Sequence, residues 1–386
     1  MSTVPGFHLI LFAASFLLAL ASGMENYALI FYVRELFGAD KNAVGWIAGA
    51  FDLAYLGGIL AFLRWKAPHP RRVLWLSAWA MAASIAVFLA FPLWTVTFVF
   101  HALFGLAMAL FWPRIMGWLS WGVEGKSLTR TMGLFNTSWS FGSILSPWLG
   151  GLLVEINPRW PFLTAVVILF LLGLLMPLGS RLFPAMRQGP PEAKPQVEGE
   201  PTTRSSLRYP ARIGIAATYF VSGSLLFIFP AWAKEALGFS ESLTGSFLLV
   251  RMALATVGFS LFARWTFWHH RLSALLGGML ALLVLLALFP LGTQAWQFYL
   301  LFGASGLVFS FLYSTTLFHG VSGSSDRERA TTFHEALLNL GLFLGTVAAG
   351  WISQTWSMAW AFGLCAAVVL SLMALQVALY RATLSR

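Results

Sequence analysis

The stretch RELFGADKNAVG at residues 34–45 returns as KEALGFSESLTG at residues 234–245, an offset of 200 positions. The glutamate and both glycines coincide, and the first position keeps its positive charge. The same offset pairs Arg64 with Arg264, Trp65 with Trp265, Arg71 with Arg271, Gly150 with Gly350, Trp160 with Trp360 and Phe162 with Phe362. Because turn glycines and loop charges are not hydrophobic background, they indicate two copies of one structural unit.

The amino-acid composition indicates the environment in which both copies fold. Only 10% of the 386 residues are Asp, Glu, Lys or Arg, whereas 59% are apolar. The mean hydropathy is +0.77. This balance lies far from that of a water-soluble globular chain, so the sequence predicts a membrane protein.

Apolar stretches of about 20 residues, long enough to cross a ~30 Å hydrocarbon layer as helices, recur between short polar breaks. We predict twelve such spans, six in each copy, at residues 7–33, 44–63, 73–92, 94–113, 131–154, 160–182, 211–233, 243–263, 272–291, 293–318, 331–354 and 356–380. No strand pattern occurs between them. The predicted fold class is therefore an all-α membrane protein, with twelve transmembrane helices in two pseudo-symmetric six-helix bundles.

One long polar stretch separates the copies. Phe183–Tyr209 is rich in proline and mixed charges and contains few large apolar side chains, a composition typical of linkers. We predict an N-terminal bundle at residues 1–182, a cytoplasmic linker at 183–209 and a C-terminal bundle at 210–386.

Small residues four positions apart indicate where predicted helices can approach each other closely. The pairs are Gly45 with Gly49 and Gly341 with Gly345. Because neither member of a pair carries a side chain, a second backbone can pack against them.

The net charge of +10 does not indicate a nucleic-acid-binding protein, because the basic residues alternate between loops rather than share one face. With a cytoplasmic N-terminus, nineteen of the 24 Lys and Arg residues fall on the cytoplasmic side and four on the outer side. The positive-inside rule then predicts that both termini are cytoplasmic. We expect a multi-pass protein of the cytoplasmic (inner) membrane, surrounded by the lipid bilayer.

The fifth predicted helix carries a glycine and proline motif. It consists of Gly133, Gly142, Ser146, Pro147, Gly150 and Gly151. With two six-helix bundles, this motif resembles the major facilitator superfamily over essentially the whole chain, and its drug/proton antiporters in particular. Those proteins have the spacing G-x8-G-x3-G-P-x2-G-G, from which only Ser146 departs. The resemblance implies that this helix presses on a neighbour and seals the transport pathway on one side, with simple packing as the alternative.

The family's other motif, a glycine followed four residues later by an aspartate and then basic residues, is degraded here. Arg64, Arg71 and Arg72 supply the charge of the cytoplasmic loop between the second and third helices, but Ala61 or Phe62 stands where the acid is expected. A gating mechanism that relies on that acid is therefore not expected.

Four charged residues, Glu25, Asp52, Arg251 and Glu335, lie within predicted helices. A charge at mid-helix costs about 3 kcal/mol on insertion scales, so such groups usually face water or pair with one another. We predict that Glu25 couples transport to protons, with Asp52 as the second candidate. The alternatives are a fixed ion pair of Glu25 with Arg251 and a gating or inter-bundle role for Asp52.

Further polar residues are candidates for a substrate cavity. The set is Glu25, Asn26, Tyr32, Asn136, Arg251, Glu335 and Asn339. A salt bridge is the alternative for Arg251, and a cytoplasmic gate is the alternative for Glu335, which shares a helix face with Asn339. For Asn136 and for His101 in the fourth helix, we expect hydrogen-bonded helix packing.

Two short motifs suggest other chemistry but fail in detail. Gly125-Lys126-Ser127 ends like a phosphate loop, but Ser120 occupies the position of the first glycine and no strand precedes it. His334-Glu335 begins like a zinc-protease helix, but the second histidine is missing. The sequence therefore predicts no enzyme, no metal site and no cofactor.

The resemblance implies a secondary transporter that works by alternating access, with the proton gradient as its energy source. We expect a monomer that exports a small amphiphilic or drug-like molecule in exchange for protons. One alternative is a proton-coupled importer of a nutrient or anion, in which Arg251 binds the substrate. A lipid flippase or a non-transporting membrane receptor on the same fold is a further alternative.

Overall fold

The computed structural model describes residues 6–62, 69–120, 125–184, 186, 206–265, 267–321 and 327–384. Within these ranges, the side chains of Ser120, 125–130, Met132, Val321, 327–331 and Leu384 lie outside the description. The described ranges consist of helices joined by short turns, and no strand occurs in them. The all-α prediction is therefore confirmed.

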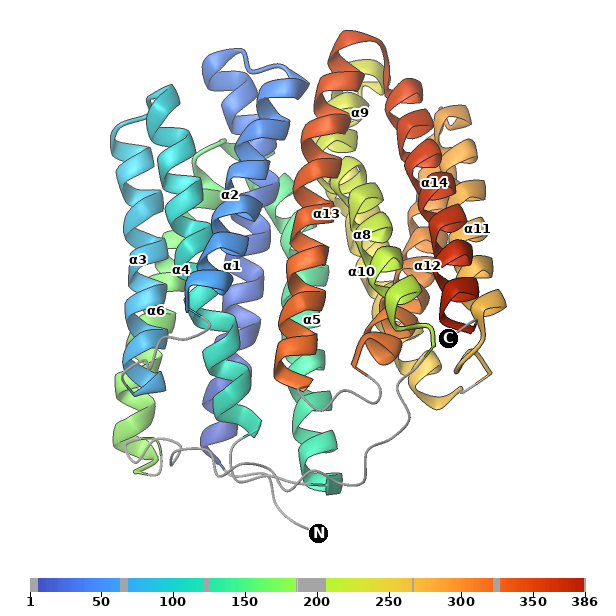
Figure 1. Cartoon of the computed structure of the whole chain (residues 1–386). Coiled ribbons are helices and arrows are strands. Elements are labelled where there is room, and N and C mark those ends of the chain that lie inside the picture. Colours follow the sequence, from blue (N-terminus) through green and yellow to red (C-terminus); the bar gives the residue numbers. More distant parts are fainter. Residues whose placement is uncertain are drawn as a thin grey trace. The chain divides into compact units, whose positions relative to one another are not determined.

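Six helices form the first half of the chain (Figure 1): α1 (Phe7–Phe37), α2 (Lys41–Phe62), α3 (Pro70–Ala90), α4 (Trp94–Ser120), α5 (Gly125–Ile156) and α6 (Trp160–Leu182). The second half contains α8 (Arg208–Gly223), η1 (Ser224–Ile228), α9 (Phe229–Leu237), α10 (Glu241–Arg264), α11 (Leu272–Leu288), η2 (Phe289–Leu291), α12 (Ala295–Val321), α13 (Arg327–Thr355) and α14 (Met358–Leu384). Because α8, η1 and α9 form one continuous span, the second half also has six membrane helices.

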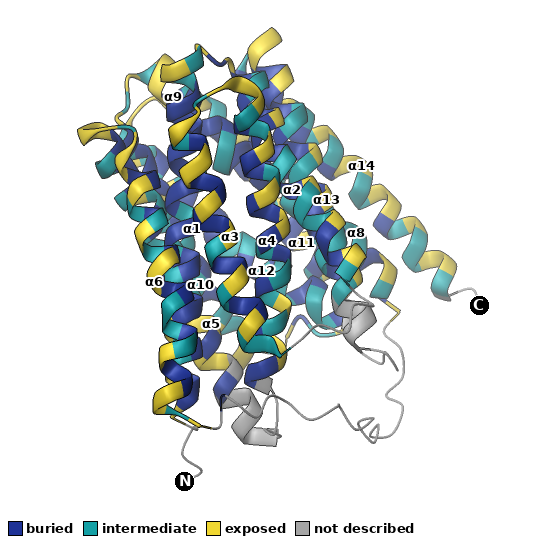
Figure 2. Cartoon of the chain, turned by 90° about the vertical axis from the view of Figure 1, so that its left-hand side faces the viewer, coloured by how far each residue is buried: buried dark blue, intermediate teal, exposed yellow. Residues whose placement is uncertain are grey.

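Eleven spans among the described residues are long and apolar enough to cross a membrane. The remaining long helix is α5, whose sequence is rich in serine, threonine and glycine. Along the helices, buried residues alternate with exposed ones (Figure 2), and many exposed side chains are large and apolar. Exposed apolar faces of this kind suit a hydrocarbon solvent. The predicted twelve-helix membrane architecture is confirmed.

The chain divides into two compact units. The first comprises Met1–Tyr32 with Ala50–Gln196, and the second comprises Val33–Gly49 with Val197–Arg386. The end of α1 and the beginning of α2 therefore group with the second unit, although they precede residue 183. Most of the predicted linker, residues 187–205, lies outside the described residues. The domain boundaries given by the sequence stay a prediction.

Close glycine packing joins α8 and α13 in the second unit. A Cβ on Gly341 would collide with the backbone oxygen of Ala216, and a Cβ on Gly345 would collide with that of Phe220. Across from them, a Cβ on Gly223 would lie 2.5 Å from the amide nitrogen of Thr346. The close helix contact predicted from the spacing of Gly341 and Gly345 is confirmed.

The seventh span changes its helical pitch in the middle. In η1, a π-helix, the N–H of Phe229 donates to the carbonyl oxygen of Ser224, five residues earlier. Pro230 follows directly in the first turn of α9 and has no N–H to donate. Single π turns within α-helices often occur at functional sites. Hydrophobic periodicity did not predict this change of pitch.

The 200-residue repeat reappears in the backbone at two matching turns. Gly38 follows α1 with φ of 64°, and Gly238 ends α9 with φ of 65°. No heavy atom lies within 4 Å of the position of a Cβ at either glycine, so crowding does not select glycine there. The left-handed backbone does, because it is strained for a residue with a Cβ atom.

We expect Gly38→Ala and Gly238→Ala each to lower the free energy of unfolding by about 1 kcal/mol, because an L-residue pays that cost in the left-handed region. Thermal unfolding in detergent measures the shifts. Gly57→Ala, within α2 and also uncrowded, is the control and should not destabilise. Equal shifts in all three variants would contradict the role of the backbone angle.

Candidate functional site

A buried acid and a buried histidine lie together in the first unit. Glu25 on α1 and His101 on α4 are both 0% exposed, and 3.6 Å separates Glu25 Oε1 from His101 Nε2. Asn26 Nδ2 donates to Glu25 Oε2 at 3.0 Å and to the carbonyl oxygen of Ser22 at 2.9 Å. The amide thus fixes one carboxyl oxygen, while the other faces the imidazole.

This pair can hold a proton without carrying a net charge. A neutral acid beside a neutral imidazole and a carboxylate beside an imidazolium both have zero net charge. Burial strongly penalises an isolated ion. Adding or removing one proton would leave a net charge, which requires water or a charged ligand at the site. The arrangement is therefore suited to exchange a proton only when the site is open.

Asp52 on α2 is the second buried acid of this unit. It is 1% exposed, and neither carboxyl oxygen has a hydrogen-bond partner among the described residues. Its neighbour Phe51 lies against His101, with 5.3 Å between the ring centroids. A Cβ on Gly105 of α4 would lie 2.5 Å from the backbone oxygen of Phe51, so α2 and α4 touch here. Asp52 is thus on a helix that packs beside His101.

The motif of α5 packs against the helix that carries Glu25. A Cβ on Gly142 would lie 2.5 Å from the backbone oxygen of Phe16, and one on Gly150 would lie 3.2 Å from that of Met24. Ser146, the one position that departs from the spacing that the motif resembles, lies against Gly23 of α1, where a Cβ would collide with the hydroxyl. At this position the glycine is Gly23 on α1 and not residue 146 on α5, and the two helices still pack closely.

The other motif positions contribute less to this contact. No heavy atom lies within 4 Å of the position of a Cβ at Gly133. Pro147 lies inside α5 and is half-buried, and Gly151 is buried.

Two further predicted cavity residues of the first unit, Tyr32 and Asn136, make other contacts. Tyr32 packs its ring against Phe88 and Phe162, with centroid distances of 5.4 and 5.1 Å. Asn136 on α5 is exposed and accepts a hydrogen bond from Trp139 Nε1 at 3.2 Å. Neither residue contacts Glu25 through the hydrogen bonds, ion pairs or ring contacts of the described residues, and their place in a substrate cavity stays a prediction.

Arg251 on α10 is the buried cation of the second unit. It is 6% exposed, its Nη2 donates to Ser222 Oγ at 3.0 Å, and its guanidinium lies 4.7 Å from the centroid of the Phe309 ring. Ser222 is on α8, two residues before the first residue of the π-helix, Ser224. No carboxylate pairs with Arg251 among the ion pairs of the described residues. A hydroxyl and an aromatic face therefore hold this guanidinium.

Glu335 and Asn339 on α13 contact each other through the backbone. Asn339 Nδ2 donates to the carbonyl oxygen of Glu335 at 2.8 Å, so the amide is bonded within its own helix. Glu335 is half-buried, and the neighbouring His334 packs edge-on against Tyr313 at 5.5 Å. Among the described residues, no group of three or more His, Cys, Asp or Glu could hold a metal ion.

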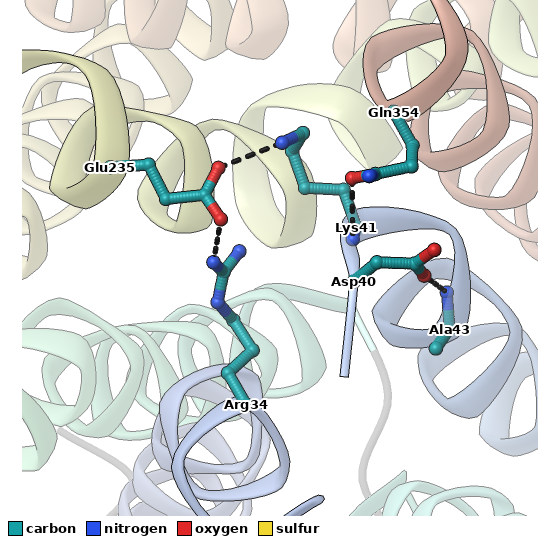
Figure 3. A network of polar contacts seen from close by, with 6 residues as sticks. All are labelled: Arg34, Asp40, Lys41, Ala43, Glu235 and Gln354. Atoms are coloured by element: carbon teal, nitrogen blue, oxygen red, sulfur yellow. Dashed lines mark hydrogen bonds and ion pairs between the residues drawn. The ribbon is translucent and has the colours of Figure 1, made fainter. Parts of the chain in front are cut away.

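An ion-pair network lies where α1 ends and α2 begins, within the second unit (Figure 3). Glu235 of α9 pairs with Arg34 Nη2 and, at 2.7 Å, with Lys41 Nζ. The amide of Lys41 donates to Gln354 Oε1 of α13 at 3.3 Å, and Asp40 Oδ1 accepts from the amide of Ala43 at 2.7 Å. These contacts attach the α1–α2 turn to α9 and α13.

We expect Glu235→Gln to lower the free energy of unfolding by about 1 kcal/mol, a modest effect because the glutamate is 41% exposed. The loss should shrink in 1 M salt, which screens the pairs. Thermal unfolding in detergent at low and high salt measures both. Glu35→Gln, at the exposed position that the repeat pairs with Glu235, is the matched control and should change little. A loss independent of salt would contradict an electrostatic role.

One assignment from the sequence is wrong. Arg71 and Arg72 lie in the first turn of α3, not in a loop, because α3 begins at Pro70. His69 Nδ1 accepts a hydrogen bond from the amide of Arg71 at 3.2 Å and caps the helix. Proline is also well suited to a first helical turn. Arg64 lies outside the described residues.

His101 is the functional candidate whose role the sequence left as packing. It is the one titratable residue in the stretch 94–113, and that isolation was a usable signal. Its partner could not be identified, because α1 and α4 are far apart in the sequence.

Comparison with known proteins identifies a family for this chain. The model of the Major Facilitator Superfamily matches residues 11–322 and again 213–385, in agreement with the internal duplication. Comparison with curated proteins gives no significant match.

Solved structures give a similar result. A mutant of the peptide transporter POT in complex with sulfate is 14% identical, with a TM-score of 0.77 over 97% of this chain and 95% of that chain. The nucleoside transporter NupG is 14% identical, with a TM-score of 0.75 over 97% and 99%. A bacterial homolog of the human lysosomal transporter Spinster, inward-facing and occupied, is 13% identical, with a TM-score of 0.69 over 99% and 97%. At these identities the likeness shows the fold. Together with the family match, it shows that the chain belongs to the major facilitator superfamily, as a multi-pass membrane transport protein and not an enzyme.

Proposed function

We propose that this transporter exports a small amphiphilic or drug-like molecule in exchange for protons. The observation that carries the proposal is the buried pair of Glu25 and His101, 3.6 Å apart and both 0% exposed. A pair that is neutral with one proton resists a change of charge until its surroundings change. Alternating access supplies that change, because the site opens to one side at a time.

In this cycle the proton and the substrate compete for Glu25. A cationic substrate that reaches the site from the cytoplasm favours the carboxylate, so the acid releases its proton. After the substrate leaves on the outer side, Glu25 takes up a proton from there and regains its neutral form. Asn26 holds the carboxyl in place during both steps through its hydrogen bond to Oε2. The proton gradient is then the energy source, and no cofactor is needed.

The motif of α5 supports the outward direction. Its members Gly142, Ser146 and Gly150 contact the part of α1 that ends next to Glu25. In the antiporters that the motif resembles, this helix seals one side of the pathway. The proposal includes a monomer in the cytoplasmic (inner) membrane with both termini in the cytoplasm, as the loop charges predict.

Transport into inside-out membrane vesicles tests the proposal. The probes are ethidium and tetraphenylphosphonium as lipophilic cations, alanyl-alanine as a peptide and uridine as a nucleoside. We expect an acidic vesicle interior to drive uptake of at least one lipophilic cation, with protons leaving as the cation enters. Uptake together with protons would contradict exchange. Ligand-dependent thermal stabilisation without flux of any probe would indicate a receptor instead.

A proton-coupled importer of a nutrient or anion is the second candidate, and Arg251 favours it. The guanidinium is 6% exposed and is held by Ser222 and Phe309, so its fork can take a carboxylate or another anion. Two of the similar structures bear the names of a peptide and a nucleoside transporter. Accumulation of alanyl-alanine or uridine in right-side-out vesicles with an acidic exterior, lost in Arg251→Gln, would establish this alternative.

A further inference from the structure

A basic cavity lies between α3 and α6 in the first unit, and the proposed transport cycle does not use it. Its volume is about 560 Å³. The residues that matter for its chemistry are three arginines and two tryptophans: Arg71, Arg72, Arg181, Trp75 and Trp79. The first turn of α3 and the last turn of α6 supply the arginines, so the cavity is at the ends of two membrane spans.

The aromatic wall of the cavity is held in place by packing. A Cβ on Gly173 of α6 would collide with the indole of Trp79, so only glycine lets this ring lie against α6. Trp79 Nε1 donates to the carbonyl oxygen of Phe170 at 3.2 Å. Trp75 packs edge-on against Trp79, with 4.9 Å between the ring centroids. The cavity is therefore a built feature of the α3–α6 contact.

The three arginines bring positive charge, and no acid pairs with them among the residues that the structure describes. Neither α3 nor α6 contains an aspartate or glutamate. None of the three arginines takes part in an ion pair within the described ranges. Guanidinium groups are well suited to bind phosphate through paired hydrogen bonds. The cavity is therefore complementary to a phosphate-bearing anion.

Exposed apolar side chains lie on the same two helices as the cavity. Leu76 of α3 is 50% exposed, and Leu178 and Leu182 of α6 are 49% and 73% exposed. Tryptophan is typical of the membrane interface, where its ring lies at the level of the headgroups. A ligand that places an anion among the arginines would thus lay its apolar part along exposed leucines.

We propose that this cavity binds the headgroup of an anionic phospholipid. The arginines bind the phosphate, the indole rims face the glycerol region, and the acyl chains lie along the exposed leucines of α3 and α6. Basic pockets between membrane helices bind anionic headgroups in this way. A free phosphate would gain the arginines but not the apolar contact.

Native mass spectrometry of the detergent-purified protein tests the proposal, with dioleoyl phosphatidylglycerol, dioleoyl phosphatidylcholine and inorganic phosphate as probes. We expect phosphatidylglycerol to bind about 10-fold or more tightly than phosphatidylcholine, because basic residues near a membrane surface each favour an anionic lipid. The triple variant R71Q/R72Q/R181Q should lose this preference. Equal binding of both lipids by the unaltered protein would overturn the proposal. So would inorganic phosphate that displaces phosphatidylglycerol at equimolar concentration.

A matched variant separates a site from general attraction to positive charge. R264Q/R271Q/R381Q removes the same number of charges from exposed positions of the second unit and should keep the preference. If it loses as much as the cavity variant, the proposal fails. R71K/R72K/R181K keeps the charge and guards against misfolding, and it should retain part of the preference. Brominated phosphatidylglycerol should also quench less fluorescence in Trp75→Phe/Trp79→Phe than in the unaltered protein, and an unchanged quench would place the lipid elsewhere.

Discussion

Glu25→Gln is expected to abolish proton-coupled transport while the protein stays folded and still binds its substrate. Glutamine has nearly the same shape and keeps an oxygen that can accept the hydrogen bond from Asn26, but it cannot take up or release a proton. The proton flux should therefore fall to that of empty liposomes. Because the substitution removes an ionisable group from a fully buried position, stability should not decrease.

Proteoliposomes with a trapped pH dye measure this prediction, with substrate added under an imposed pH gradient. Glu155→Gln is the matched control, because it makes the same change at an exposed position of α5 and should leave coupling intact. Glu25→Gln should still exchange substrate across the membrane without a gradient. Normal coupling in this variant would exclude Glu25 as the proton carrier.

Variants of Asp52 and His101 show which of the two buried acids carries the proton. If Glu25 carries the proton, His101→Gln should shift the pH at which transport is half-maximal, because the imidazole is the group that faces Glu25 Oε1. Asp52→Asn should then retain coupling. The opposite pattern, with coupling lost in Asp52→Asn and kept in Glu25→Gln, would transfer the role to Asp52.

The sequence predicted the architecture well, because a membrane imposes it locally. Each span needs its own run of apolar residues, and turn glycines such as Gly38 and Gly238 are selected by the backbone angle at one position. The helix ends were less accurate. The third helix begins at Pro70 and not at residue 73, because proline and arginine in a first turn do not look apolar. The π-helix at Ser224–Ile228 left no pattern in the sequence.

The candidate site could be predicted only in part. A buried glutamate is visible in the sequence because its charge is costly in a helix. Its partner is not visible, since contact between α1 and α4 depends on how the helices pack. For the same reason, the hydrogen bond from Arg251 to Ser222 was not predicted. The contact of Ser146 with Gly23 on α1 also could not be predicted, because it depends on how α1 and α5 pack.

Gly345→Val is expected to lower the stability of the folded protein more than any other single change considered. A Cβ at this position would collide with the backbone oxygen of Phe220 and lie 2.6 Å from its carbonyl carbon and 2.7 Å from its Cα. A side-chain neighbour could rotate away, but backbone atoms can yield only if α8 and α13 move apart. Overpacking of this kind costs about 1–3 kcal/mol and occasionally more. Gly363→Val on α14, where no heavy atom lies within 4 Å of the position of a Cβ, is the control for valine in a helix.

The same substitution links packing to the chemistry of the second unit. Phe220 precedes Ser222 by two residues on α8, and Ser222 holds the guanidinium of Arg251. Displacement of α8 from α13 should therefore loosen Arg251 as well as lower the unfolding temperature. Thermal unfolding in detergent and substrate-dependent stabilisation should both decrease in Gly345→Val and not in Gly363→Val. If only the unfolding temperature falls, α8 transmits no strain to the Arg251 site.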